Sequence, residues 1–338
     1  MEELKVYYVV KGWSEELGIA ELKALLETYG ENTRELKCYT MICVADTSSL
    51  DNLYRVARRA SSIREVGLLL GVDNPYEPEL PFLDRALEFV DRVRWIKPSV
   101  FRYTEREAVV KYTEEVSRAL SLPTSFKPAS YLHLMFSEGL VFVGYPLAEQ
   151  DRKSIAAHKP SARPFFRSIA LPPQFSRLLV NLARVKEGDT LLDPFVGTGS
   201  ILIEAGSMGI RGIGVDIDWK LALGARTNLE YYGLKNQVVI LGDSTTLEYV
   251  SIDGVATDPP YGRAASTHGA ELRDVYSGFI LRSSRSVKRG GYIVFMSPLA
   301  LEDFVDEEIC RSGLVVKGKH YMYVHGGLTR MVYEVYKP

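Results

Sequence analysis

Apolar and polar positions along the first 147 residues follow a mixture of strand and helix periodicities. Residues 14–29 carry apolar side chains at helical spacing, and Ser14 is the expected N-cap of that helix. The same reasoning predicts strands at 4–10, 35–46, 63–70, 90–95, 131–136 and 140–145, and helices at 49–60, from Leu80 onwards and at 105–120. The mixture predicts small α+β modules in this part of the chain.

From Gln174 onwards, strands and helices alternate regularly. The pattern predicts strands at 190–193, 212–216, 238–240, 254–257 and 292–296, with helices at 174–184, 199–208, 219–232 and 270–288. Such alternation is typical of α/β proteins with a parallel, doubly wound sheet. Residues 314–323 and 329–336, joined by a turn at Val324-His325-Gly326-Gly327, predict an antiparallel hairpin at the end of that sheet.

The stretch 148–173 separates these two patterns. It has few apolar runs, four prolines and an excess of basic residues, so we expect a basic linker. The predicted organisation is therefore a first module at 1–70, a second at 71–147, the linker at 148–173 and an α/β domain at 174–338.

Composition narrows the class of protein. The 338 residues are 46% hydrophobic and 25% charged, as in soluble globular proteins. No apolar run approaches the roughly 18 residues that span a bilayer, and the first residues do not resemble a signal peptide, so we expect a cytoplasmic protein. Cys38, Cys43 and Cys310 lack metal-ligand spacing and are expected to be reduced thiols. A net charge of −2 does not by itself predict a nucleic-acid partner.

Four predicted strands end in an acid followed by small or turn residues. The first runs into Asp193-Pro194-Phe195-Val196-Gly197-Thr198-Gly199-Ser200, where glycines allow a tight turn and the next helix N-terminus favours a carboxylate ligand. The motif lacks the third glycine of the dinucleotide pattern, which disfavours NAD. Asp193, Phe195, Gly197, Thr198 and Gly199 are therefore candidates for binding another cofactor.

The second and third of these strands supply further acceptors. Asp216 is placed to accept from two ribose hydroxyls, while Asp243 and Ser244 could hold an adenine ring by its amino group and by a backbone N–H. Each acid alone is more often a helix cap or a solvated turn. Because ligands of open α/β sheets lie at the carboxyl ends of the strands, four such acids in order predict one site.

The fourth strand ends in Asp258-Pro259-Pro260-Tyr261-Gly262. The two prolines fix φ at about −65° and carry no N–H, so the strand must stop at Asp258. The Asp258 carboxylate and the Pro259 carbonyl would accept hydrogen bonds from an exocyclic amine, and Tyr261 offers a face for a planar base. Taken alone, the motif could equally be a strand-ending turn with a buried tyrosine.

Together these motifs resemble the amino-group methyltransferases that use S-adenosylmethionine and carry an Asp/Asn-Pro-Pro-Tyr signature. With Arg163-Pro164-Phe165-Phe166-Arg167 and the region before residue 148, the chain is similar to the THUMP-containing archaeal tRNA (guanine-N2)-methyltransferases, which act on guanosine at position 10 of tRNA. The resemblance implies S-adenosylmethionine as cofactor, a Rossmann-like methyltransferase domain at 174–338, a ferredoxin-like module at 1–70 and a THUMP module at 71–147. Val196 stands where that family usually has a cysteine.

The resemblance also implies roles for the fourth motif. Asp258, Pro259, Pro260 and Tyr261 would be catalytic, with Asp258 also facing the cofactor. A guanine paired in a stem must be swung out to reach them, and Tyr261 would stack on it. Whether Asp258 takes the proton or only positions the amine, and whether one methyl or two are added, stay open at this stage.

Basic residues outside the motifs are candidates for contacting tRNA phosphates. They are Arg92, Arg94, Lys97 and Arg102 in the second module, and Arg152, Lys153, Lys159, Arg163 and Arg167 in the linker. We expect neither a metal, since there is no His/Cys/Glu cluster, nor an obligate protein partner. Alternative hypotheses are an amino-methyltransferase for rRNA, DNA adenine or protein glutamine, and an inactive RNA-binding protein.

Overall fold

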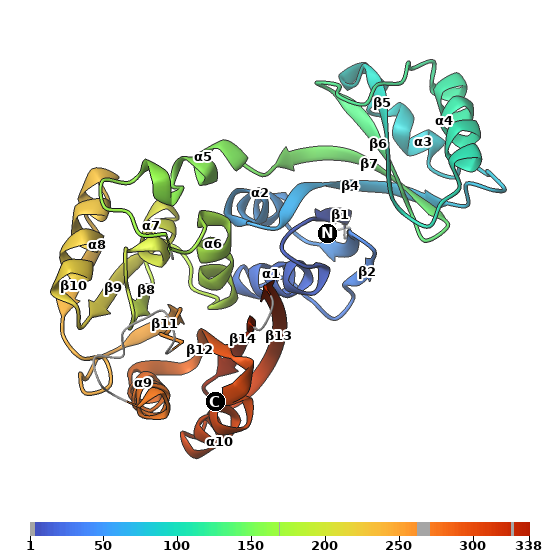
Figure 1. Ribbon diagram of the computed structural model, residues 1–338. Coiled ribbons are helices and arrows are strands. Elements are labelled where there is room, and N and C mark those ends of the chain that lie inside the picture. Colours follow the sequence, from blue (N-terminus) through green and yellow to red (C-terminus); the bar gives the residue numbers. More distant parts are fainter. Residues whose placement is uncertain (1–3, 169, 262–270, 326–327) are drawn as a thin grey trace. The chain divides into compact units, whose positions relative to one another are not determined.

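The computed structural model describes residues 4–168, 170–261, 271–325 and 328–338. The predicted positions Gly262, Gly326 and Gly327 lie outside these ranges. The chain divides into two units, Met1–Asp151 and Arg152–Pro338, and the described residues of each form one seven-stranded sheet (Figure 1).

The first unit is built on a sheet with the strand order β2-β3-β1-β4-β7-β6-β5, in which β5 and β6 are parallel and the other neighbours antiparallel. Its strands are β1 (Leu4–Val10), β2 (Lys37–Tyr39), β3 (Ile42–Thr47), β4 (Ile63–Asp73), β5 (Trp95–Arg102), β6 (Tyr131–Ser137) and β7 (Leu140–Glu149). Its helices are α1 (Glu15–Thr28), α2 (Leu50–Arg59), α3 (Leu83–Leu87), η1 (Val90–Arg92) and α4 (Arg106–Leu120). The long strand β4 pairs with both β1 and β7, so one sheet runs through both stretches that the sequence assigns to separate modules.

Local signals explain where several of these elements begin. Ser14 caps α1 as predicted, because its hydroxyl accepts from the Leu17 N–H at 3.1 Å. The strand expected at 90–95 is wrong: Val90–Arg92 form a 3-10 turn, and β5 begins at Trp95. Alternation over so few positions does not distinguish a strand from such a turn.

The cysteines of the first unit are not the reduced thiols that we expected. Cys38 and Cys43 lie directly opposite each other on β2 and β3, and a disulfide joins them, whereas Cys310 is exposed and unpaired. The reason is the tight β2–β3 hairpin, which brings the two Cα atoms to 4.0 Å. Sequence spacing alone could not supply that register.

The second unit has the strand order β10-β9-β8-β11-β12-β14-β13, with the first five strands parallel and the last two antiparallel, as predicted. Its strands are β8 (Thr190–Asp193), β9 (Arg211–Asp216), β10 (Gln237–Leu241), β11 (Ile252–Thr257), β12 (Val287–Pro298), β13 (Val315–His325) and β14 (Leu328–Tyr336). Its helices are α5 (Arg152–Ala157), η2 (Pro160–Ala162), α6 (Pro173–Leu182), α7 (Ser200–Ser207), α8 (Trp219–Tyr231), α9 (Leu272–Ser286), η3 (Leu299–Leu301) and α10 (Glu302–Arg311). Sequence patterns did not indicate α10, and the stretch expected as a linker contains α5, with Ile155 buried.

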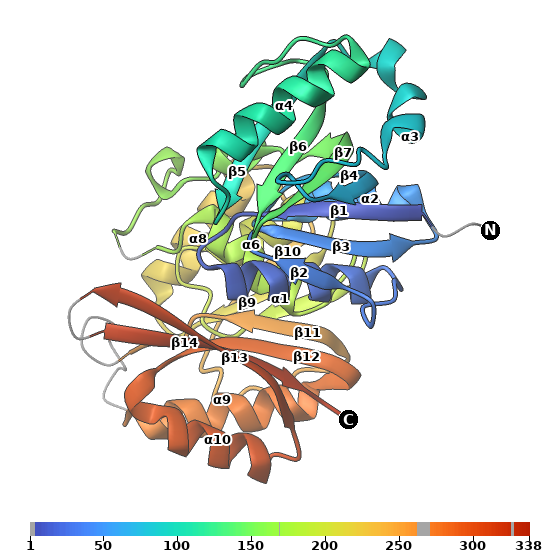
Figure 2. The same cartoon turned by 90° about the vertical axis from the view of Figure 1, so that its right-hand side faces the viewer.

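Helices cover both faces of this second sheet. Val255 of β11 packs into a core with Phe279 of α9 and Ile309 of α10, whereas the neighbouring Gly254 faces Val185, just after α6. Figure 2 shows α9 and α10 on one side of β11 and β12, and α6 on the other. This layering leaves the carboxyl ends of the parallel strands at one edge of the sheet, where the predicted acids lie.

Candidate active site

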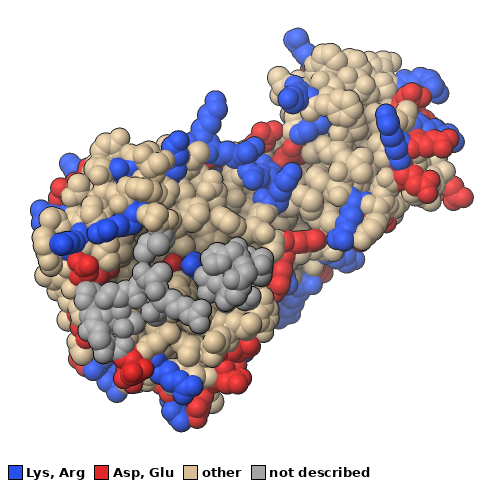
Figure 3. All heavy atoms as spheres, in the orientation of Figure 1, with Lys and Arg blue, Asp and Glu red and all other residues tan. Residues whose placement is uncertain are grey.

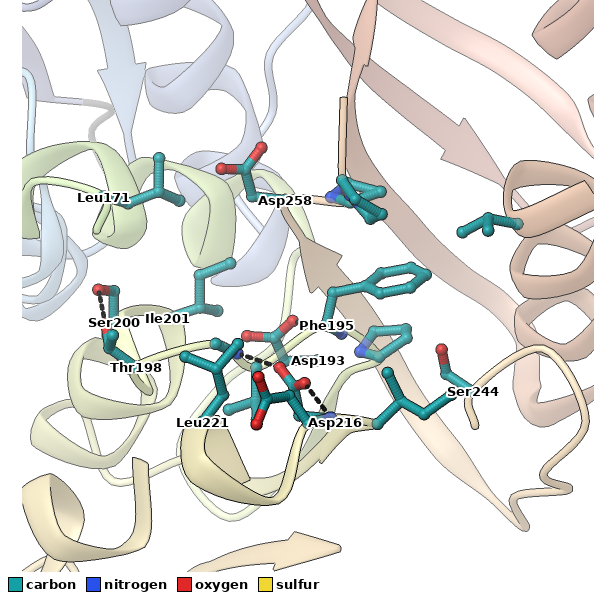
Figure 4. A pocket seen from close by; sticks show the side chains of 18 of the residues that line it. Leu171, Asp193, Phe195, Thr198, Ser200, Ile201, Asp216, Leu221, Ser244 and Asp258 are labelled. Atoms are coloured by element: carbon teal, nitrogen blue, oxygen red, sulfur yellow. Dashed lines mark hydrogen bonds between the residues drawn. The ribbon is translucent and has the colours of Figure 1, made fainter. Parts of the chain in front are cut away.

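The residues that follow the strands β8, β9, β10 and β11 line a single cavity of about 580 Å³. The four predicted acids Asp193, Asp216, Asp243 and Asp258 all contribute to its wall. In the view of Figure 4, Asp216 and Asp258 lie at different ends of the cavity, with Asp193 between them. The volume is within the range of sites that enclose a cofactor or drug-sized ligand.

Asp193 ties the ends of two strands together. It is only 1% exposed, and its Oδ1 accepts from the Thr257 hydroxyl at 2.7 Å and from the Phe195 N–H at 3.2 Å. Burial raises the pKa of the Asp193 carboxyl to about 7, because desolvation outweighs these two hydrogen bonds. Asp193 therefore fixes the β8 and β11 ends relative to each other, which sets the spacing of the cavity wall.

The glycine turn after Asp193 has the geometry that only glycine adopts without strain. Gly197 and Gly199 have φ values of +52° and +83°. A Cβ on Gly199 would also lie 3.4 Å from that of Ala225 on α8. Gly197, Thr198 and Ser200 line the cavity at the start of α7, where a helix N-terminus favours a carboxylate.

Asp216 is held by the backbone and faces the cavity. Its Oδ2 accepts from the Gly197 N–H at 3.0 Å and its Oδ1 from the Asp218 N–H at 2.9 Å (dashed in Figure 4). These two bonds fix the orientation of the Asp216 carboxylate at the cavity wall.

Asp243 and Ser244 form the wall after β10. The Asp243 Oδ1 accepts from the Thr245 N–H at 2.9 Å and from the Thr245 hydroxyl at 2.7 Å, which closes the turn. Ser244 is 4% exposed and lines the cavity. Half of the Asp243 carboxylate is thus committed to the turn, and its other oxygen remains as an acceptor.

Asp258 and Tyr261 form the remaining end of the cavity. The Tyr261 hydroxyl donates to the Asp258 Oδ1, and Pro259 and Pro260 between them also line the cavity. Burial raises the pKa of the Asp258 carboxyl to about 6, against the hydrogen bond from Tyr261 and the charge of Arg330, which both lower it. Asp258 is therefore largely ionised at neutral pH and able to accept a proton.

Two charged residues of the cavity wall were not predicted as part of this site. Arg330 on β14 places its guanidinium 4.4 Å from the centroid of the Tyr261 ring, and Asp274 on α9 also lines the cavity. Arg167 was predicted only as a phosphate contact, yet it lines the same cavity. The available signal for Arg330 was its place at the start of an antiparallel strand, which returns to the edge where the parallel strands end.

Most of the predicted RNA-contacting residues are exposed. These are Arg92, Arg94, Arg102, Arg152, Lys153, Lys159 and Arg167. Lys97 is partly exposed, and its Nζ donates to the Tyr131 hydroxyl at 3.0 Å. On the face that Figure 3 shows, Lys and Arg are interspersed with Asp and Glu.

The prediction that Arg163 contacts RNA is wrong. It is 5% exposed, and its guanidinium donates to the Ser200 Oγ at 2.6 Å and, through Nε, to the His158 carbonyl at 3.0 Å. A guanidinium enclosed in this way cannot reach a phosphate. Arg163 instead fastens the segment before α6 to the first turn of α7, next to the glycine turn.

Among the described residues, no group of His, Cys, Asp and Glu side chains could hold a metal ion. In the same part of the chain, no helix has the length and apolar character needed to cross a membrane.

Known proteins are similar to this chain in sequence and in fold. Residues 160–331 match the family model described as "RMKL-like, methyltransferase domain". The tRNA (guanine(10)-N2)-dimethyltransferase of Pyrococcus abyssi is 33% identical over 341 residues, which cover 97% of this chain and 98% of that protein. The Methanothermobacter thermautotrophicus protein of the same name is 41% identical over 189 residues, or 55% of each chain. The structure of TrmN from Thermus thermophilus superimposes with a TM-score of 0.55 and 19% identity, covering 99% of this chain and all of that one, a likeness of fold alone.

Proposed function

This chain belongs to the family of the tRNA (guanine(10)-N2)-dimethyltransferases, and we propose that its cavity transfers methyl groups from S-adenosylmethionine to the 2-amino group of guanosine 10 in tRNA. The full-length similarity to the Pyrococcus abyssi enzyme is the observation that carries this function. We further propose that the reaction takes place in the cytoplasm and runs twice at the same nitrogen, giving first the monomethylated and then the dimethylated base.

The cavity wall suits S-adenosylmethionine, which supplies an electrophilic methyl group when bound. Asp216 lines this wall and would accept hydrogen bonds from the ribose hydroxyls, and the positive-φ turn at Gly197–Gly199 leads to the start of α7 for the methionine carboxylate. Asp243 and Ser244 would hold the adenine. Phe195 and Thr198 line the same wall, and Asp193 fixes the ends of β8 and β11 relative to each other.

Asp258 and Pro259 would bind the target amine. The 2-amino group of guanine is a weak nucleophile, because its lone pair is delocalised into the ring. Hydrogen bonds from this amine to the Asp258 carboxylate and the Pro259 carbonyl would aim the nitrogen at the methyl group. As the new N–C bond forms, the bond between the methyl carbon and the sulfonium sulfur would break and leave a neutral thioether. The amine then loses one proton, and Asp258, largely ionised at neutral pH, would accept it.

Tyr261 and Pro260 would complete the base pocket. A guanine that has left its stem loses stacking, which the Tyr261 ring can replace. The Tyr261 hydroxyl, which donates to Asp258 in this structure, would share that carboxylate with the incoming amine. The rigid backbone at Pro259 and Pro260 keeps the acceptors in place while the base enters.

The first unit would hold the tRNA. We propose that residues 1–70 form a ferredoxin-like module and residues 71–147 a THUMP-like module, with the exposed Arg92, Arg94 and Arg102 against phosphates. Exposed basic residues at 152, 153, 159 and 167, which precede α6 in the second unit, would supply further phosphate contacts. The Arg102 guanidinium lies 4.6 Å from the centroid of the Tyr103 ring, and this contact would restrict it for binding a phosphate oxygen.

The test is nucleoside mass spectrometry of a tRNA transcript treated with the enzyme and S-adenosylmethionine. We expect mono- and dimethylguanosine at position 10 from the wild type, and neither from Asp258→Ala, although its cofactor affinity by calorimetry should stay within a few-fold. Asp303→Ala removes an exposed acid of α10 and should behave as the wild type. Methylated adenosine, methylation of rRNA instead of tRNA, or an absence of cofactor binding would each contradict the proposal.

A further inference from the structure

The Asp258 carboxylate and the Pro259 carbonyl would bind an amino group, but guanine and adenine both carry one. Hydrogen-bond acceptors alone therefore do not choose between the two bases. The bases differ at position 6, where guanine has the acceptor O6 beside the acceptor N7 and adenine has an amino donor. A side chain that only donates, placed in the same cavity, would accept guanine and reject adenine.

Arg330 is such a side chain. It lines the cavity together with Asp258 and Tyr261, and its guanidinium lies 4.4 Å from the centroid of the Tyr261 ring. Its position follows from topology: β14 runs antiparallel to β12, so Arg330 pairs with Pro298, the last residue of β12, at the edge where β11 also ends. An arginine has five N–H donors and no acceptor.

The guanidinium of Arg330 has an unused donor. Its Nε is buried, and no acceptor lies within hydrogen-bond distance among the residues that the structure describes. The two described arginines of this domain that are buried as whole residues have partners: Arg177 donates through Nε to Glu204 at 2.7 Å, and Arg163 donates to Ser200 and His158. A buried N–H without a partner is rare in proteins, so a donor left open beside the base-binding rim points to an acceptor on the ligand.

We propose that Arg330 is a specificity-determining residue, which donates a hydrogen bond to O6 of the target guanine, with N7 as a second acceptor, and so selects guanine over adenine-like bases that carry an amino donor at position 6. This inference rests on the proposed function. The contact with the Tyr261 ring restricts the guanidinium, and an arginine fork matches two adjacent acceptors such as O6 and N7. The positive charge also lies close enough to Asp258 to favour its ionised form.

The test compares two targets that share the 2-amino group. One tRNA carries guanosine at position 10, and the other carries 2,6-diaminopurine, in which an amino donor replaces O6; both face an abasic site, so that neither target has a base pair to break. Single-turnover methyl transfer is measured for the wild type, Arg330→Met and Arg330→Lys, with cofactor affinity by calorimetry as a check of folding. Arg289→Met, which removes an exposed arginine of β12 outside the cavity, is the matched control.

We expect the wild type and Arg289→Met to prefer guanosine by roughly 5- to 150-fold, the effect of about 1–3 kcal/mol for a bidentate arginine–guanine contact. Arg330→Met should slow transfer to guanosine and bring the preference close to one. Arg330→Lys, which keeps the charge but not the fork, should fall between them, so the prediction stands even if the methionine variant does not fold.

Three results would overturn the inference while leaving the function intact. They are a wild type without preference, an Arg330 variant that slows both targets equally, as for a residue that only supports Tyr261, and an Arg330 variant with no change. If the wild type transfers no methyl group to either tRNA, the proposed function itself fails, and this inference with it.

Discussion

Asp258→Asn removes the negative charge of the side chain at position 258 and leaves its shape nearly unchanged. The amide keeps an oxygen in place of Oδ1 but cannot ionise or take up a proton. Because burial raises the pKa of Asp258 to about 6, the wild-type carboxylate becomes protonated as the pH falls through 6. The rate of methyl transfer should then fall about tenfold for each further pH unit. The variant should show no such decline.

The size of the loss at high pH follows from the hydrogen bond that the amine makes. A bond to a charged acceptor contributes about 1.5–3 kcal/mol, so replacing the carboxylate should slow transfer at pH 8 by roughly 10- to 150-fold. The assay is single-turnover transfer to a tRNA transcript between pH 5 and 8.5, at saturating cofactor. Calorimetry at each pH controls for cofactor binding, and Asp303→Asn should keep the wild-type profile.

Other charged and titratable groups near Asp258 affect the interpretation of the pH profile of methyl transfer. Tyr261 and Arg330 lower its pKa, and Tyr276, which feels its charge, stays neutral over this range. Asp193 is different, because burial raises its pKa to about 7 and it therefore titrates in the same window. An acidic decline that persists in Asp258→Asn would belong to Asp193 or another group, and would refute the assignment of the proton acceptor to Asp258.

Three further predictions concern the wall of the cavity and the basic residues. Asp193→Asn should flatten the pH dependence of stability: the raised pKa of Asp193 means that its contribution is present below about pH 4 and is lost as the pH rises through 7. Urea unfolding of the wild type should therefore lose roughly 2–3 kcal/mol relative to this variant between pH 5 and pH 8. Asp216→Ala should weaken S-adenosylmethionine binding at least about tenfold by calorimetry, since the acceptor proposed for the ribose is lost; unchanged affinity would contradict the assignment. Arg163→Ala should lower the free energy of unfolding by about 2–4 kcal/mol, because it leaves buried partners unsatisfied, whereas Arg167→Ala should alter unfolding by less than about 0.5 kcal/mol and reduce the salt dependence of tRNA binding.

The parallel part of the second sheet could be predicted because each residue pattern acts locally. Strands that alternate with helices must run parallel, and their carboxyl ends must meet at one edge. The acids Asp193, Asp216, Asp243 and Asp258 each end or follow such a strand, so their meeting in one cavity follows from order along the chain. The sequence could not indicate which oxygens are already used, as those of Asp193 are by Thr257 and Phe195.

Features that depend on one specific contact between residues escaped prediction. Arg163 looked like one member of a basic run, but its burial depends on Ser200 on α7, 37 residues away. The disulfide between Cys38 and Cys43 depends on the register of a short hairpin that composition does not specify. In both cases the residue type was visible and the neighbour that fixes its role was not.

Arg330, whose place in the cavity depends on the sheet topology, bears on how the enzyme chooses its base. The Asp258–Tyr261 motif suits any amine on a flat ring. It therefore explains the chemistry but not the choice of guanine. The selecting donor comes from β14, about 70 residues later, because a parallel sheet that closes with an antiparallel hairpin brings the start of that strand back to the reacting edge. Reaction type and base selection would then be carried by different strands of one sheet, so Asp258→Asn should impair transfer to guanosine and to 2,6-diaminopurine alike, while Arg330→Met should change their ratio.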